Sequence, residues 1–100
     1  MVKEINSEEF KEVIKEGKVV VDFFATWCGP CKMLSPVMDN IANDLQDVKF
    51  FKVDVDKNED IAREYGIMSI PTIIVFKNGE IVNTLVGLRS KDELLEFIKE

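Results

Sequence analysis

The chain has 100 residues, 46% of them hydrophobic and 32% charged, which is the size and composition of one globular domain without a second core. Thirteen basic residues against nineteen acidic ones give a net charge of −6, which argues against nucleic acid or an anionic membrane as the main partner. A chain of this length forms a core without cross-links, so its two cysteines are not needed as a structural staple.

The start of the chain carries Lys3 and Glu4 where a signal peptide would need an apolar segment. The longest apolar stretch, 19–25, is interrupted by Asp22 and is far shorter than the ~18–20 residues of a membrane span. Two closely spaced cysteines without an export signal are typical of the reducing cytosol. We therefore expect a cytoplasmic protein.

The first elements expected are a short edge strand over 2–5 and a helix after it. Asn6 and Glu9 match a capping box, and apolar residues from Phe10 onward recur at helical spacing. Gly17 suits the C-terminal cap of this helix.

Residues 18–25 form a run of β-branched and aromatic side chains that is apolar on both faces except at Asp22. This pattern predicts a central strand covered by helices on both sides. Apolar residues at helical spacing over 34–45 predict that a helix follows.

Residues 48–55 are the next predicted strand. Asp56 and Glu59 offer a capping box for a short helix that stops at Gly66.

Two strands over 72–76 and 80–86 flank Asn78-Gly79, which is the strongest short signal for a hairpin. Ser90 and Glu93 then cap a last helix. The resulting order, β-α-β-α-β-α-β-β-α, requires a parallel sheet with helices on its faces and one antiparallel pair at the hairpin. We therefore expect an α/β fold with a mixed sheet.

The most informative motif is Cys28-Gly29-Pro30-Cys31, which lies between the end of a strand and the start of a helix. Its spacing brings the sulfur atoms within disulfide reach, and Pro30 fits the first helical position. Unpaired backbone N–H groups and the helix dipole then stabilise a thiolate at Cys28, which is the nucleophile in disulfide exchange. We expect an exposed Cys28 that attacks a substrate disulfide and a Cys31 that resolves the mixed disulfide.

Two other uses of the cysteine pair are half of a zinc site and a pair of unreactive thiols. Structural zinc needs four cysteine or histidine ligands, and this chain has two cysteines and no histidine. A C-x-x-C motif in a βαβ context favours redox chemistry over both. Without a Gly-rich dinucleotide fingerprint or a metal cluster, we expect no cofactor and no metal.

The segment 21–33, with Trp27-Cys28-Gly29-Pro30-Cys31 inside it, resembles the active-site segment of the thioredoxin family. The resemblance covers nearly the whole chain and implies the thioredoxin fold, a mixed sheet of four to five strands flanked by four helices. One departure is Phe24, where many thioredoxins have a second tryptophan. Further matches follow in order at Pro36, Lys52-Val53-Asp54-Val55-Asp56, Tyr65-Gly66-Ile67, Ile70-Pro71-Thr72 and Phe76-Lys77-Asn78-Gly79.

Asp22 is a carboxylate within an apolar strand, so desolvation should raise its pKa and let it exchange protons near neutral pH. The resemblance implies that this buried acid lies behind Cys31 and assists its deprotonation, with Lys52 close by. The alternatives are that Asp22 is a strand-edge carboxylate that faces water and that Lys52 is a solvated lysine.

For the bond before Pro71, the resemblance implies a cis Ile70–Pro71 peptide that faces the cysteine pair. The Ile70 backbone would then pair with an extended substrate segment. An ordinary proline at the first residue of a strand is the alternative.

An apolar, flat rim around Cys28 would suit protein substrates better than a small molecule, which needs a deeper pocket. Trp27 could instead belong to the core, and Gly87 could serve a turn or a bulge. The residues expected to bind substrate are Trp27, Gly29, Pro30, Ile70, Pro71 and Gly87.

The resemblance therefore implies a monomeric reductase of protein disulfides that a separate thioredoxin reductase recharges. One alternative is a binding subunit that uses the same rim without turnover. Another is an oxidase or isomerase of an oxidising compartment, which a less negative redox potential would reveal.

Overall fold

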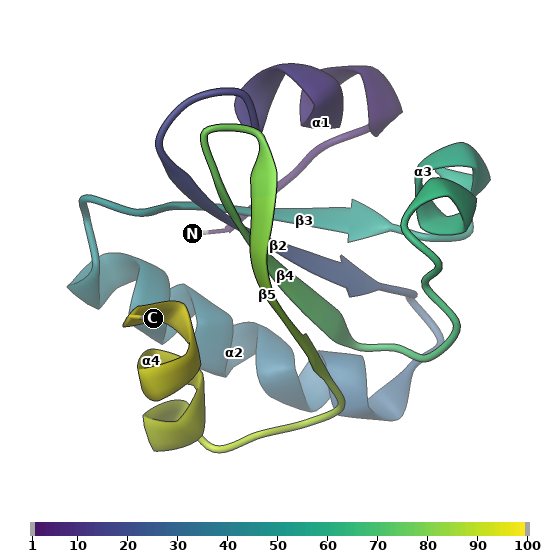
Figure 1. The fold of residues 1–100 in the computed structure, drawn as a ribbon. Helices are drawn as coiled ribbons and strands as arrows, with labels where there is room; N and C mark the ends of the chain where they lie inside the picture. The colour runs from purple at the N-terminus through teal and green to yellow at the C-terminus, as the bar shows by residue number, and fades with distance from the viewer. Residues whose placement is uncertain (1, 100) are drawn as a thin grey trace.

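A computed structural model describes residues 2–99, and its helices and strands follow the predicted order (Figure 1). The strands are β1 (Lys3–Glu4), β2 (Lys18–Phe24), β3 (Lys49–Asp54), β4 (Thr72–Lys77) and β5 (Glu80–Val86). The helices are α1 (Ser7–Val13), α2 (Gly29–Asp44), α3 (Glu59–Glu64) and α4 (Lys91–Lys99).

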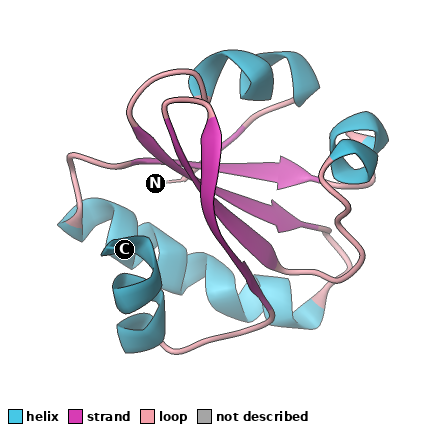
Figure 2. Cartoon of the chain, viewed as in Figure 1, coloured by secondary structure: helices cyan, strands magenta, loops and turns pink. Residues whose placement is uncertain are grey.

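The five strands form one mixed sheet in the order β1-β3-β2-β4-β5 (Figure 2). Strand β3 pairs in parallel with β1 and β2, whereas β4 pairs antiparallel with β2 and β5. The expected mixed α/β sheet is confirmed, and β2 occupies its centre. Within residues 2–99 no helix is both long and apolar enough to span a membrane.

Helices cover both faces of the sheet, with α2 and α4 on one side and α1 and α3 on the other (Figure 1). Val20 of β2 packs in the core cluster that contains the buried residues of α2 and α4. Its neighbours Val19 and Val21 pack in the cluster that contains those of α1 and α3. Successive side chains of a strand point to opposite faces, so the run apolar on both faces follows from a strand buried on both sides.

Two predicted capping boxes form. Asn6 Oδ1 accepts the Glu9 N–H at 2.9 Å while the Glu9 carboxylate accepts the Asn6 N–H at 3.0 Å. Ser90 and Glu93 make the same reciprocal bonds before α4, each at 3.2 Å. Such boxes satisfy helix N–H groups that have no partner inside the helix.

The prediction that Gly17 caps α1 is wrong. The helix ends at Val13 with Ile14 as its C-cap, and Gly17 lies in the turn that follows, with φ +75°. Its N–H donates to Asn78 Oδ1 at 2.9 Å, and its carbonyl accepts the Asn78 N–H at 3.0 Å. The glycine therefore joins two turns at one end of the sheet.

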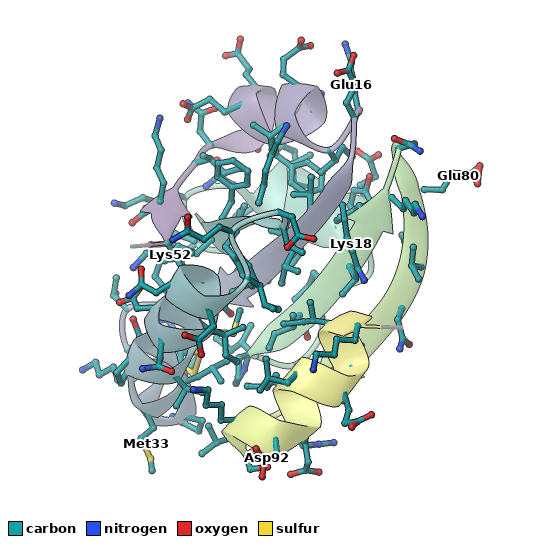
Figure 3. All side chains as sticks on the ribbon, turned by 90° about the vertical axis from the view of Figure 1, so that its left-hand side faces the viewer. Glu16, Lys18, Met33, Lys52, Glu80 and Asp92 are labelled. Carbon is teal, nitrogen blue, oxygen red and sulfur yellow. A yellow bond between two sulfur atoms is a disulfide. The ribbon has the colours of Figure 1, made fainter. Side chains whose placement is uncertain are left out.

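Figure 3 shows the two ends of the molecule, with Glu16 and Glu80 at one of them and Met33 and Asp92 at the other. Glu16 lies in the turn that contains Gly17, and Glu80 is the first residue of β5, next to the turn that contains Asn78. Met33 belongs to the first turns of α2, at the end that holds the cysteine pair.

The Asp56–Glu59 capping box is also wrong. Asn58 is the N-cap of α3 and makes no side-chain cap bond. Asp54 supplies the carboxylate of this turn instead, because its Oδ1 accepts the N–H groups of Asp56 at 2.9 Å and Lys57 at 3.4 Å. The buried turn therefore uses the last residue of β3, two positions earlier than predicted.

Candidate active site

The cysteine pair lies where β2 ends and α2 begins, and a disulfide joins Cys28 to Cys31, with Cα atoms 5.2 Å apart. Cys28 is the N-cap of α2, and its Sγ accepts the backbone N–H of Cys31 at 3.2 Å. The helix begins at Gly29, so Pro30 occupies its second position, whereas the sequence predicts the first. Both positions tolerate proline, since their N–H groups have no partner within the helix.

The prediction that Cys28 is exposed is wrong for the disulfide form. Cys28 and Cys31 each expose only 4% of their surface, and they pack with Ala25, Phe24 and Ile70. Exposure therefore does not distinguish the two sulfurs. What distinguishes them is position, because only the Cys28 sulfur accepts a backbone N–H at the positive end of the helix dipole.

Asp22 is a buried acid on the central strand, 3% exposed, so it is not a strand-edge carboxylate facing water. Within residues 2–99 its Oδ1 has no hydrogen-bond partner. Burial raises the pKa of Asp22 from 3.8 to about 7, and the nearby positive charge of Lys52 opposes part of that rise. The carboxyl group therefore changes protonation state near neutral pH.

Lys52 lies beside Asp22 across the β2–β3 pair, as their register shows. The side chain is half-buried, and its Nζ lies 5.3 Å from the centroid of the Phe24 ring, which is a cation–π distance. Figure 3 labels Lys52 on the half of the sheet that contains β3. The Phe24 ring thus contributes to holding this lysine.

A cavity of about 230 Å³ brings three predicted residues, Asp22, Cys31 and Lys52, to one space. A proton could pass between Asp22 and Cys31 through this space, with or without water between them. The other residues that line the cavity are Phe24, Ala25, Thr26, Lys32 and Ser35.

The Ile70–Pro71 peptide bond is cis, as expected, and precedes β4. The Ile70 carbonyl oxygen lies 3.9 Å from Cys28 Sγ. Gly87 has φ +97°, and its N–H donates to the Pro71 carbonyl at 2.8 Å. This bond holds the end of β5 against the start of β4, beside the cysteine pair.

The predicted rim is only partly exposed. Trp27 is 69% exposed and therefore not a core residue, and Gly29 and Pro30 are exposed as well. Ile70 and Gly87 are half-buried, whereas Pro71 is buried. The rim around Cys28 is thus formed mainly by Trp27, by the first residues of α2 and by Ile70.

Asp56 is a site residue that the sequence reasoning missed. Its Oδ2 accepts the indole N–H of Trp27 at 2.7 Å, which holds the exposed ring beside the cysteine pair. The local sequence predicts a helix cap for this carboxylate, and nothing near residue 56 indicates a partner 29 positions away. Among residues 2–99, no three histidine, cysteine or acidic side chains gather as a metal site would require.

Comparisons with known proteins agree with this geometry. The thioredoxin family model matches residues 1–100. Thioredoxins of Listeria monocytogenes and Rickettsia prowazekii are 46% and 48% identical over 101 and 103 residues, covering all of this chain and 98% of each relative.

Two solved structures have the same fold. The thioredoxin of Plasmodium falciparum superposes with a TM-score of 0.92 at 38% identity, covering 98% of this chain and 97% of that one. Oxidised mitochondrial thioredoxin 3 of Saccharomyces cerevisiae superposes with a TM-score of 0.90 at 38% identity, over 98% of this chain and 93% of that one.

Proposed function

This chain belongs to the thioredoxin family and is a thiol–disulfide oxidoreductase, and we propose that it reduces disulfides in target proteins, with Cys28 as the attacking residue. The observation that carries this proposal is the position of the cysteine pair. Cys28 Sγ accepts a backbone N–H at the N-terminus of α2, and Cys31 lines a cavity with an acid of pKa about 7.

In the first step the Cys28 thiolate attacks one sulfur of the target disulfide. A bond forms between Cys28 and that sulfur, the target S–S bond breaks, and the other target sulfur leaves as a thiolate. The Ile70 carbonyl, 3.9 Å from Cys28 Sγ, supports pairing with an extended target segment.

In the second step Cys31 gives up its proton and attacks the Cys28 sulfur. The Cys28–Cys31 disulfide forms, and the target sulfur leaves and takes a proton from solvent. We assign proton acceptance to Asp22, because its ionised form is disfavoured by burial and it shares a cavity with Cys31. Lys52 would keep part of the Asp22 population ionised.

Two electrons and two protons then return the pair to the dithiol, and we assign their delivery to a thioredoxin reductase. Trp27, Gly29, Pro30, Ile70, Pro71 and Gly87 would contact both kinds of partner protein. We also propose that residues 1–100 act as one monomeric domain. This domain would work in the cytoplasm without a resident cofactor.

Single-cysteine variants test the division of roles. Cys31→Ser should accumulate mixed disulfides with protein targets, whereas Cys28→Ser should accumulate none, and neither should turn over. Mass spectrometry of the trapped species identifies the bonded cysteine. Trapping through Cys31 in the Cys28→Ser variant would contradict the assignment.

Turnover and redox potential separate the two remaining alternatives. A binding subunit would retain its partners without catalytic reduction of a protein disulfide. An oxidase or isomerase would equilibrate with glutathione at a potential near or above about −180 mV, whereas a reductase should lie near −270 mV. The titration is read from the fraction of oxidised protein, with Cys28→Ser as the redox-inactive control.

A further inference from the structure

A second apolar surface lies outside the cysteine rim, on the outer strand of the sheet. Strand β5 is at the sheet edge and is exposed or half-buried along its length. Beside it, a groove of about 210 Å³ lies between β5 and the loop from α3 to β4. We call it the β5 groove, and its principal apolar residues are Ile67, Met68, Ile74, Ile81 and Val86.

A β-bulge is what brings these side chains together. Opposite Val75 and Phe76 the pairing with β5 shifts from Asn83 to Ile81, so that Val82 has no partner on β4. Alternation would otherwise point Ile81 and Thr84 to opposite faces. The extra residue turns Ile81 to the face that carries Thr84, as bulges near functional sites commonly do.

The chemistry of the groove fits an apolar side chain. None of the described residues that line it is charged, although the chain as a whole carries a net charge of −6. Ile81 is 52%, Val86 47% and Met68 94% exposed, so contact with an apolar group would remove this surface from water. Methionine adapts its shape to different partners. The volume is below the roughly 300–1,000 Å³ of small-molecule pockets, which favours one side chain over a free ligand.

The groove is continuous with the place where the target segment meets Cys28. Ser69 and Thr72 line the groove and flank the Ile70–Pro71 peptide, while Val86 precedes Gly87. From the Thr72–Val86 pair the groove follows the strands to the Phe76–Ile81 pair, which is four residues or about 13 Å. An extended segment held at Ile70 therefore reaches it a few residues from its cysteine.

We propose that the β5 groove is a specificity subsite that binds an apolar side chain of the target protein, two to four residues from the disulfide cysteine. This proposal rests on the proposed function, because the target segment must first be held against Cys28. The groove then makes leucine-like residues near the cysteine a determinant of which disulfides are reduced fastest.

The test uses symmetrical peptide dimers joined by one disulfide. A reference peptide has only glycine and serine around its cysteine, and each further peptide has one leucine at the second, third or fourth position on either side. Second-order rate constants are measured in single-turnover reactions with the reduced protein, followed by the fluorescence of its one tryptophan. The variants are Ile81→Asp in the groove and Val82→Asp as a matched control, 44% exposed on the same strand but outside the groove.

At least one leucine position should raise the rate constant by about tenfold over the serine reference. Ile81→Asp should remove that gain, and Val82→Asp should keep it. Denaturant unfolding reports whether both variants fold, and Thr84→Asp is a second groove variant should Ile81→Asp not fold. Reduction of the serine reference tests the proposed function separately, because that reaction requires the cysteines but not the groove.

Three results would overturn the groove proposal. The first is equal rates for leucine and serine peptides, and the second is a leucine gain that survives Ile81→Asp or disappears equally in Val82→Asp. The third is a dimer in sedimentation equilibrium that Ile81→Asp dissociates, since a second copy of the chain would then be the occupant.

Discussion

Asp22 and Asp54 are buried carboxylates on adjacent parallel strands, 3% and 2% exposed, yet their surroundings differ completely. Asp54 is the last residue of β3 and accepts two backbone N–H groups of the turn that follows, those of Asp56 and Lys57. Asp22 lies deeper in β2, and within residues 2–99 its Oδ1 has no partner.

Burial therefore affects the stability of the fold differently at the two carboxylates. Asp54 replaces lost water by backbone donors, so its burial stabilises the turn that leads into α3. Asp22 loses water and gains only the positive charge of Lys52, so its burial favours the protonated form. An unpartnered buried oxygen costs folding free energy, and in the function proposed above the same carboxyl group supplies the proton acceptor.

The largest expected effect is on stability, in Asp22→Asn. A pKa raised from 3.8 to about 7 on folding corresponds to roughly 4 kcal/mol of destabilisation at pH 8. The sign follows because the unfolded chain releases this proton near pH 4 and the folded chain only near pH 7. Stability is therefore lost as the pH rises from about 4 to about 7 and is then constant.

Asparagine removes this pH dependence, so Asp22→Asn should be stabilising, and more so at pH 8 than at pH 5. Denaturant unfolding of both proteins at both pH values measures this stabilisation, which should be about 2–3 kcal/mol larger at pH 8 than at pH 5. The comparison within each variant cancels the constant cost of burying the amide. An equal effect at both pH values would mean that Asp22 titrates normally.

The same substitution should slow the release of target from the Cys28 mixed disulfide by about a hundredfold at pH 7, because Cys31 loses its proton acceptor. In the unsubstituted protein this rate should rise with pH through about 7 and then level off. Rapid mixing of reduced protein with a peptide disulfide gives the profile. An unchanged profile in Asp22→Asn would leave Asp22 without a role in proton transfer.

A smaller effect is expected for Asp54→Ala. The backbone N–H groups of Asp56 and Lys57 would lose their acceptor, which should cost about 1–3 kcal/mol of unfolding free energy. Asp54→Asn is the matched control, because it keeps an oxygen acceptor and should recover most of the loss. If Asp54→Ala instead stabilised the fold as Asp22→Asn is expected to, the contrast between the two acids would fail.

The smallest effect should come from Lys52→Met, which keeps the aliphatic part of the side chain but removes the charge that lowers the pKa of Asp22. The midpoint of the pH profile for target release should move upward by a fraction of a pH unit, with the plateau rate nearly unchanged. Lys52→Arg keeps the charge and serves as the control. A downward movement would show that Lys52 acts on another group.

Much of the fold was predictable from local patterns. The capping boxes at Asn6 and Ser90, the Asn78-Gly79 hairpin and the element order all depend on residues a few positions apart, where spacing alone fixes the hydrogen bonds or the apolar face. The chemistry of the cysteine motif was equally predictable, since it requires only that a helix begins directly after a strand.

The tertiary structure decided everything that depends on residues distant in sequence. Asp54, and not Asp56, accepts the turn N–H groups, which leaves Asp56 to hold Trp27 across 29 positions. Burial of Cys28 arises from packing against Ile70, and the β5 groove arises from one bulged residue. The sequence by itself determined that Asp22 interrupts an apolar strand. Only the packing of both sheet faces decided that Asp22 would be buried with an unpartnered oxygen. The reason is that solvation depends on the layers that cover a residue and not on its neighbours along the chain.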